Sequence, residues 1–190
     1  MATTHSSMCL GSFHPLVACV ARAPEVGAVV ILDACQSVPH MKVDVDSLGI
    51  DFLAFSGHKS LGPTGVGILW GHAELLAELP PFLFGGSMIE SVTMTDATWA
   101  PAPRKFEAGV PNMAQAVGLG AALEYLTNVG LENIHEHEIV LTARLIKGLQ
   151  QIPDVSIFGP TDLDMRGGVV AFAVKNIHPH DVGQFLDSQG

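Results

Sequence analysis

Two short apolar runs, each ending in a polar residue, constrain the fold of this chain more than any other feature of its sequence. Residues 29–33 (Val-Val-Ile-Leu-Asp) and 51–56 (Asp-Phe-Leu-Ala-Phe-Ser) have the length and continuity of parallel strands buried on both faces. A third run, residues 66–70, follows Gly62–Gly65 too closely for a helical crossover. It should therefore pair antiparallel with the second run. The sequence predicts an α/β fold with a mixed sheet.

The remaining periodicity adds helices and a second group of strands. Helices are expected at residues 15–22, 74–79, 114–151 (in two parts, broken at Gly130) and from 180 to 186. Two further strand-like runs cover residues 154–158 and 168–174, whereas residues 84–112 show no sustained period and are predicted to form a long loop. The simplest division is one domain over residues 1–152 and the start of a smaller one over 153–190.

Composition excludes several classes of protein. Hydrophobic residues make up 48% of the chain and charged residues 15%, which is unlike a disordered protein. The formal net charge is −10 and no basic run occurs, so a nucleic-acid partner is not expected. No apolar stretch is long enough for a membrane span, and the N-terminus lacks the basic region of a signal peptide. Cys9, Cys19 and Cys35 form no CxxC pair, which favours reduced thiols in the cytoplasm and no metal site.

Polar residues gather where the two strands are expected to end, and open α/β sheets bind ligands at that edge. Asp33 closes the first run and Gln36 follows it, whereas Ser56, His58 and Lys59 close the second. A desolvated lysine presents the neutral amine that Schiff-base formation requires. A carboxylate at Asp33 can pair with a protonated pyridine nitrogen. By position alone, a turn or N-cap aspartate and a surface lysine are the more frequent cases, so the combination carries the prediction.

Other conspicuous residues have simpler interpretations. Gly62-Pro-Thr-Gly-Val-Gly67 lacks the Lys-Ser/Thr ending of a P-loop and the helix of a dinucleotide fingerprint, so a tight hairpin turn is predicted. Four histidines on predicted helices are interpreted as solvated or capping residues: His135, His137, His178 and His180.

Together these motifs resemble the class V aminotransferase superfamily of pyridoxal 5′-phosphate (PLP) enzymes, which have fold type I. The resemblance is carried by Asp33-Ala-Cys-Gln36, by residues 51–59 ending in Ser-Gly-His-Lys, and by residues 62–67. Within the superfamily, Gly85-Gly-Ser-Met-Ile89 and residues 106–112 (Phe-Glu-Ala-Gly-Val-Pro-Asn) are similar to SufS-type cysteine desulfurases and selenocysteine lyases.

The resemblance implies a role for each matched position. Lys59 corresponds to the catalytic lysine that binds PLP as a Schiff base. Asp33 corresponds to the partner of the pyridine nitrogen and Gln36 to the ligand of the phenolate oxygen. Ser56 and His58 match phosphate ligands.

Two departures from the family pattern affect this site. Val110 stands where the family has a threonine that reaches across a homodimer to the partner's PLP phosphate, which leaves the backbone N–H as the donor. Met8 stands where an asparagine near the cofactor is usual.

Family members are much longer than this chain, so the resemblance implies the C-terminal part of a fold type I large domain plus part of a smaller α+β domain. The residue that stacks on the PLP ring is expected before this chain. The nucleophilic cysteine and the substrate-binding arginine are expected after it. None of the chain's three cysteines matches that nucleophile.

The implied activity is release of sulfur from L-cysteine (or selenium from selenocysteine), leaving an enzyme persulfide and alanine. The implied partners are a second copy in a homodimer and a sulfur-acceptor or scaffold protein of iron–sulfur cluster assembly. The chain alone is expected to be inactive. Two alternatives remain: another class V activity, such as an aminotransferase or a kynureninase-like hydrolase, and a non-catalytic truncated product. Residues 85–89 argue against the first, whereas Met8 and Val110 favour the second.

Overall fold

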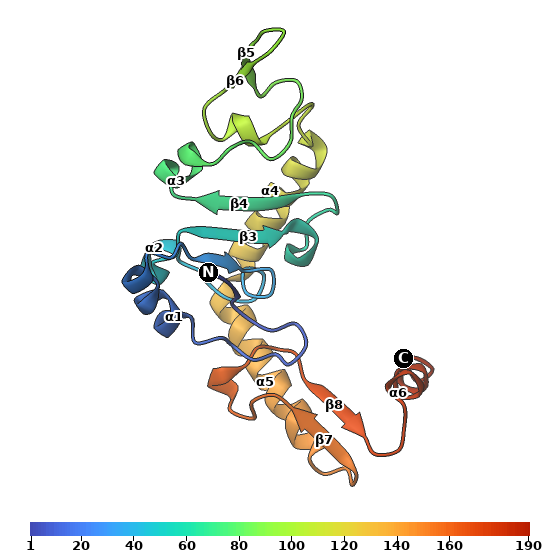
Figure 1. Ribbon diagram of the computed structural model, residues 1–190. Helices are drawn as coiled ribbons and strands as arrows, with labels where there is room; N and C mark the ends of the chain where they lie inside the picture. Colours follow the sequence, from blue (N-terminus) through green and yellow to red (C-terminus); the bar gives the residue numbers. More distant parts are fainter.

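The computed structural model describes residues 1–190, and its centre is a four-stranded sheet (Figure 1). The strands are β1 (Ala2–Thr4), β2 (Ile31–Asp33), β3 (Phe52–Ser56) and β4 (Gly67–Gly71), in the order β1-β2-β3-β4. The first three are parallel and β4 is antiparallel to β3. The mixed sheet and the antiparallel hairpin after Ser56 are thus confirmed.

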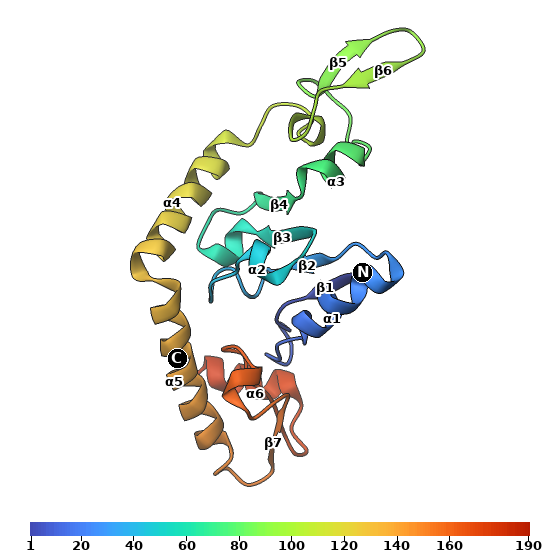
Figure 2. The ribbon, with the colours of Figure 1, turned by 90° about the vertical axis from the view of Figure 1, so that its left-hand side faces the viewer.

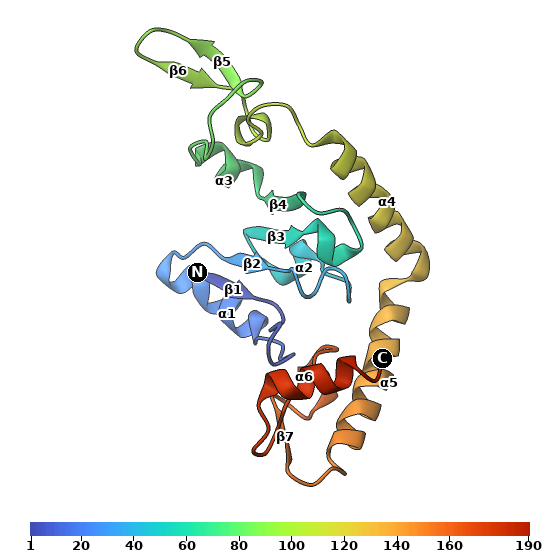
Figure 3. The same cartoon turned by 90° about the vertical axis from the view of Figure 1, so that its right-hand side faces the viewer.

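Five of the six helices occur close to the predicted positions, and the helix over Val45–Leu48 was not predicted. They are α1 (Leu16–Arg22), α2 (Val45–Leu48), α3 (Ala73–Glu78), α4 (Met113–Val129), α5 (Leu131–Leu149) and α6 (Pro179–Asp187). Gly130, with a φ of 90°, separates α4 from α5, and the two form one long bent column beside the sheet (Figures 2 and 3). His178 caps α6 by accepting a hydrogen bond from the His180 N–H at 3.2 Å, as predicted for that pair.

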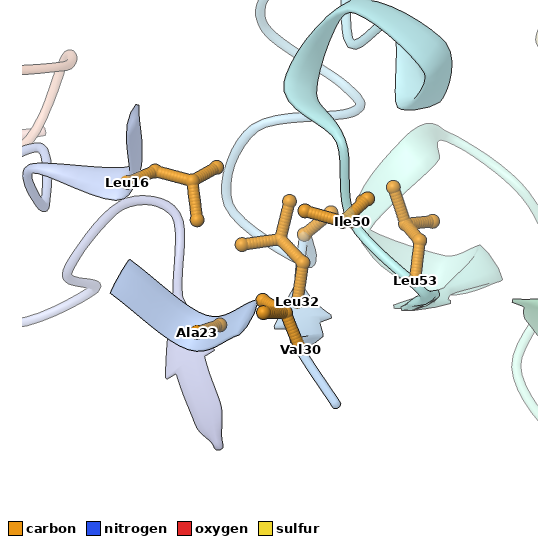
Figure 4. Packing of buried hydrophobic residues seen from close by; sticks show 7 residues of the cluster. Leu16, Ala23, Val30, Leu32, Ile50 and Leu53 are labelled. Carbon is orange, nitrogen blue, oxygen red and sulfur yellow. The ribbon is translucent and has the colours of Figure 1, made fainter. Parts of the chain in front are cut away.

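The main core cluster covers one face of the sheet at β2. Leu32 and Ile50 are fully buried and pack with Leu16, Val30 and Leu53 (Figure 4). Residues of α1 and α2 pack against this cluster. On β2 the neighbours of Leu32, Ile31 and Asp33, are exposed. The prediction that this strand is buried on both faces is therefore wrong, because its side chains alternate between a covered and an open face.

The predicted loop over residues 84–112 contains secondary structure. A hairpin of β5 (Ile89–Val92) and β6 (Ala97–Trp99) projects from one end of the molecule, followed by the 3₁₀ helix η3 (Arg104–Phe106) (Figure 1). All four residues of β5 are exposed. The hairpin therefore lacks the alternation of apolar and polar residues from which strands are predicted.

The C-terminal residues form a separate two-stranded sheet that packs near α5. It consists of antiparallel strands β7 (Val155–Phe158) and β8 (Ala171–Val174), joined through the 3₁₀ helix η4 (Leu163–Met165). Arg166 is 1% exposed and donates to the carbonyls of Leu10 (3.3 Å), Val169 (2.5 Å) and Pro160. Burial lowers the pKa of this guanidinium. Arg166 thus ties the turn after β1 to the C-terminal segment.

The molecule exposes an unusually large surface. Its solvent-accessible surface is 12429 Å², whereas a compact protein of 20.0 kDa exposes about 8,700 Å². Large apolar side chains contribute to it, among them Phe82, Val110 and Val117. Patches of this kind mark contacts with other protein. None of the helices combines the length and the apolar character needed to cross a bilayer.

Candidate functional site

The parallel strands bring their carboxyl ends to one edge of the sheet. Thr4, Asp33 and Ala54 lie opposite one another in register on β1, β2 and β3. Beyond that row, the His5 N–H donates to the carbonyl of Asp33 at 2.9 Å, and the Ala34 N–H donates to the carbonyl of Ala54 at 2.9 Å. The backbone of Asp33 is therefore held from both sides, and the polar residues after β2 and β3 emerge beside each other.

The Asp33 side chain lies on the open face of the sheet. Its Oδ1 accepts a hydrogen bond from the Cys35 N–H at 2.9 Å, and its second carboxylate oxygen has no protein partner. Asp33 is therefore exposed, unlike a residue of the predicted strand buried on both faces, because its face of β2 is open at this point. Gln36, in the turn that follows, is half-buried. The strand end thus presents a fixed carboxylate oxygen and an amide.

Ser56, His58 and Lys59 lie where β3 passes into the 3₁₀ helix η2 (Gly57–Ser60). The Ser56 Oγ is 3.6 Å from the Cys35 Sγ, which joins this strand end to that of β2. Lys59 is half-buried and forms no ion pair, and His58 is exposed. The next residue, Ser60, is fully buried and its Oγ has no hydrogen-bond partner.

The backbone of η2 is fixed by close packing. The Gly57 N–H donates to the carbonyl of Val66 at 2.9 Å, and the Gly62 N–H donates to the carbonyl of Gly57 at 3.0 Å. A Cβ at Gly62 would lie 2.9 Å from the Gly57 carbonyl oxygen and 2.9 Å from the Leu119 Cδ1 of α4. Residues 62–67 therefore form the tight connection that was predicted, and α4 holds η2 in place.

Val110, the remaining predicted site residue, lies at neither strand end. It is 85% exposed, between η3 and α4. The adjacent Gly109 N–H donates to the carbonyl of Gly86 at 2.8 Å, and the Asn112 Nδ2 donates to the carbonyl of Gly65 at 2.7 Å. This segment is thus tied to the turn before β4, and Val110 faces outward.

Sequence reasoning missed a second group of residues beside the strand ends. Gln36 also lines a cavity of about 250 Å³ together with His40, His135 and Glu138. The His40 Nδ1 is 2.6 Å from the Glu138 Oε1. His135, which was interpreted as a solvated or capping residue, is half-buried and borders this cavity. No sequence signal links His40 to α5, because 98 residues separate it from Glu138.

The polar groups at the strand ends are a carboxylate, an amide, a hydroxyl, a thiol, an imidazole and a lysine amine. No group of three or more histidine, cysteine, aspartate or glutamate side chains is arranged to hold a metal ion. The set suits an organic ligand that has a protonated ring nitrogen, an anionic group and a carbonyl carbon open to attack by an amine.

His5, at the same edge, makes stability depend on pH. Burial lowers its pKa from the ordinary value of 6.5, with a smaller contribution from the positive charge of His14, and its Nδ1 is buried without a partner. Below pH 6.5 the unfolded chain therefore binds more protons than the folded chain, so acidification favours unfolding. We expect the urea midpoint to fall between pH 7 and pH 5, and His5→Gln to reduce that fall. An equal reduction in the exposed-site control His137→Gln would contradict the assignment.

Comparisons with known proteins agree with this geometry. Residues 1–190 match the aminotransferase class-V family model. A probable cysteine desulfurase from Streptomyces coelicolor is 56% identical over 181 residues, which are 95% of this chain and 43% of that protein. The apo structure of a cysteine desulfurase from Thermococcus onnurineus NA1 superposes with a TM-score of 0.94 at 40% identity, covering 99% of this chain and 47% of that one.

A more distant structure contains a cofactor. It is a C-DES mutant with glycine covalently linked to the PLP cofactor, with a TM-score of 0.87 at 28% identity, covering 99% of this chain and 50% of that one. The chain spans about half the length of the relatives that it matches. Because the family model covers every residue, the chain belongs to the class V aminotransferase family.

Proposed function

We propose that this chain is the part of a PLP-dependent cysteine desulfurase that carries the cofactor lysine. The whole enzyme would release sulfur from L-cysteine as a persulfide, form alanine and pass the sulfur to an acceptor protein of iron–sulfur assembly in the cytoplasm. The observation that carries the proposal is the meeting of Asp33, Ser56 and Lys59 at one sheet edge. The identity of 56% to a probable cysteine desulfurase supports the reaction class.

The residues at the edge fit PLP chemically. One carboxylate oxygen of Asp33 accepts a hydrogen bond from the Cys35 N–H, and the second is available to accept one from a protonated ring nitrogen. Gln36 can donate to the phenolate oxygen, and Ser56 and His58 can donate to the phosphate. In a homodimer, the backbone N–H of Val110 would add a donor from the partner. Bound PLP supplies an electron sink for the charge that develops at the substrate Cα.

Lys59 has two tasks in this proposal. Its amine holds the cofactor covalently through the aldehyde carbon, for which it must be an unpaired nucleophile. The structure supports this because Lys59 forms no ion pair and lies on a short, fixed 3₁₀ helix. When substrate takes its place, the freed amine can accept a proton from the substrate Cα and return it.

The sulfur step requires a residue that this chain does not provide. A thiolate attacks the substrate sulfur, the carbon–sulfur bond breaks, its electron pair stays with the substrate carbon, and protonation gives alanine. The resemblance assigns that thiolate to a segment beyond residue 190 and to none of Cys9, Cys19 and Cys35. We therefore expect no alanine from L-cysteine with this chain alone.

Cofactor binding tests the proposal directly. The purified chain should take up one PLP with a visible absorption band, and borohydride should remove the band. Peptide mass spectrometry should then find the pyridoxyl group on Lys59. A label spread over the exposed lysines Lys42, Lys147 and Lys175, or no label, would refute the proposal.

A further inference from the structure

We propose that Glu138 of α5 is a positioning residue for the cofactor edge of the sheet and that it acts through His40. This inference rests on the proposed function, because the groups positioned are those assigned to the PLP ring. It concerns the segment after β2, residues 34–41, which we call the ring-side turn. Asp33 directly precedes this turn, and Gln36 lies within it.

The hydrogen bond between Glu138 and His40 is shorter and less exposed than the two ion pairs of the chain. The His40 Nδ1 lies 2.6 Å from the Glu138 Oε1, and the two side chains are 42% and 25% exposed. The pairs Arg22–Glu25 and Lys175–Asp154 span 3.6 Å each, and their side chains are 63–81% exposed. Pairs as exposed as those contribute little. His40–Glu138 is also the only hydrogen bond between the ring-side turn and α5.

The ring-side turn can transmit this restraint because it is internally hydrogen-bonded. The N–H groups of Ser37 and Val38 both donate to the carbonyl of Ala34 at 3.0 Å. The N–H groups of His40 and Met41 both donate to the carbonyl of Ser37 at 2.9 Å. Ala34 and Ser37 are fully buried. A fixed His40 therefore fixes the turn back to the end of β2.

The other side of Glu138 faces the C-terminal segment. Its carboxylate lies against Gly168, where a Cβ would come within 3.7 Å of the Glu138 Cδ. A second, smaller cavity is lined by Glu138, Thr142 and Arg166, and the Arg166 Nε is buried there without an acceptor. The guanidinium donates only to carbonyls, and no ion pair joins it to the carboxylate of Glu138. Glu138 thus lies between the ring-side turn and the C-terminal segment.

A cavity separates the ring-side turn from α5, and it makes the restraint specific to the cofactor edge. Gln36, His40 and Glu138 all line the cavity of about 250 Å³, so little packing other than this hydrogen bond holds the turn against α5. Loss of the bond should free His40 and Gln36, whereas Ala34 stays held because it belongs to the buried core cluster around Leu32.

The test compares PLP affinity with local order in purified variants of the full chain. Glu138→Ala and His40→Ala should each raise the PLP dissociation constant by about tenfold, because each removes one hydrogen bond to a charged group. The double variant should be no worse than either single one, because both remove the same interaction. His40→Asn should retain most of the affinity, because the Asn Nδ2 can donate from nearly the position of the His Nδ1. The control Glu136→Ala, exposed on the same helix, should bind PLP as the unmodified chain does.

Amide exchange without PLP separates this inference from the proposed function. The N–H groups of Val38, His40 and Met41 should exchange faster in Glu138→Ala than in Glu136→Ala, with equal urea midpoints in the two variants. Unchanged amide exchange and unchanged PLP affinity in Glu138→Ala would refute the positioning role. Equal losses of PLP affinity in His40→Asn and His40→Ala would refute it as well. If the unmodified chain binds no PLP, the proposed function fails, whereas the exchange comparison, made without PLP, still decides whether Glu138 orders the ring-side turn.

Discussion

Lys59→Ala is expected to reduce borohydride-fixed PLP to background and to weaken reversible PLP binding by about a hundredfold or more. The amine is the only group at the strand ends that can form an imine with the aldehyde carbon, which borohydride then fixes, because the carboxylate, amide, hydroxyl, imidazole and Cys35 thiol there cannot. In a prearranged site the amine meets the bound aldehyde at a high effective concentration, which favours the covalent link, and the variant lacks this amine. Spectroscopic titration, followed by reduction and peptide mapping, measures both quantities.

Two control variants show whether the loss of PLP label and of PLP affinity is due to loss of the Lys59 amine. Lys59→Arg keeps a long cationic side chain but cannot form the link, so it should also give no fixed label. Lys42→Ala removes an exposed lysine and should change neither quantity. Fixed label that persists in Lys59→Ala would mean that another lysine carries the cofactor.

The sequence was sufficient for the parts of the fold that depend on chain connectivity. The antiparallel pairing of β3 and β4 followed from the short connection through Gly62 and Gly65, which excludes a crossover helix. The placement of Asp33 and Ser56 at one edge followed from parallel strands that end in polar residues. The roles of these residues came from family resemblance, and they stay predictions, as does the domain boundary between residues 152 and 153.

What could not be predicted depends on contacts between distant residues. A short apolar run does not tell whether one or both faces of its strand are covered, so the exposure of Asp33 was missed. Glu138 and His40 belong to no motif, and only the path of α5 past the sheet brings them together (Figures 2 and 3). The hairpin of β5 and β6 was missed because an exposed ribbon without a core face has no periodic pattern.

Leu32→Ala is expected to lower the free energy of unfolding by about 3–5 kcal/mol, the range for leucines deleted from a tightly packed core. Leu32 is fully buried between Leu16, Val30, Ile50 and Leu53 (Figure 4). This cluster contains only seven buried residues, so little neighbouring material can move in to fill the cavity. A domain is typically stable by about 5–15 kcal/mol, and the variant would lose a large share of that.

Ile31→Ala is the matched control, because Ile31 precedes Leu32 on β2 but lies on the open face and is 41% exposed. It should cost about 1 kcal/mol or less. Urea unfolding followed by circular dichroism measures both variants, and equal losses would contradict the one-sided core. Since Asp33 follows Leu32 directly, the two variants also show whether PLP binding at the strand end depends on the stability of the core. If the edge depends on the core, Leu32→Ala should weaken PLP binding at urea concentrations that leave Ile31→Ala unaffected.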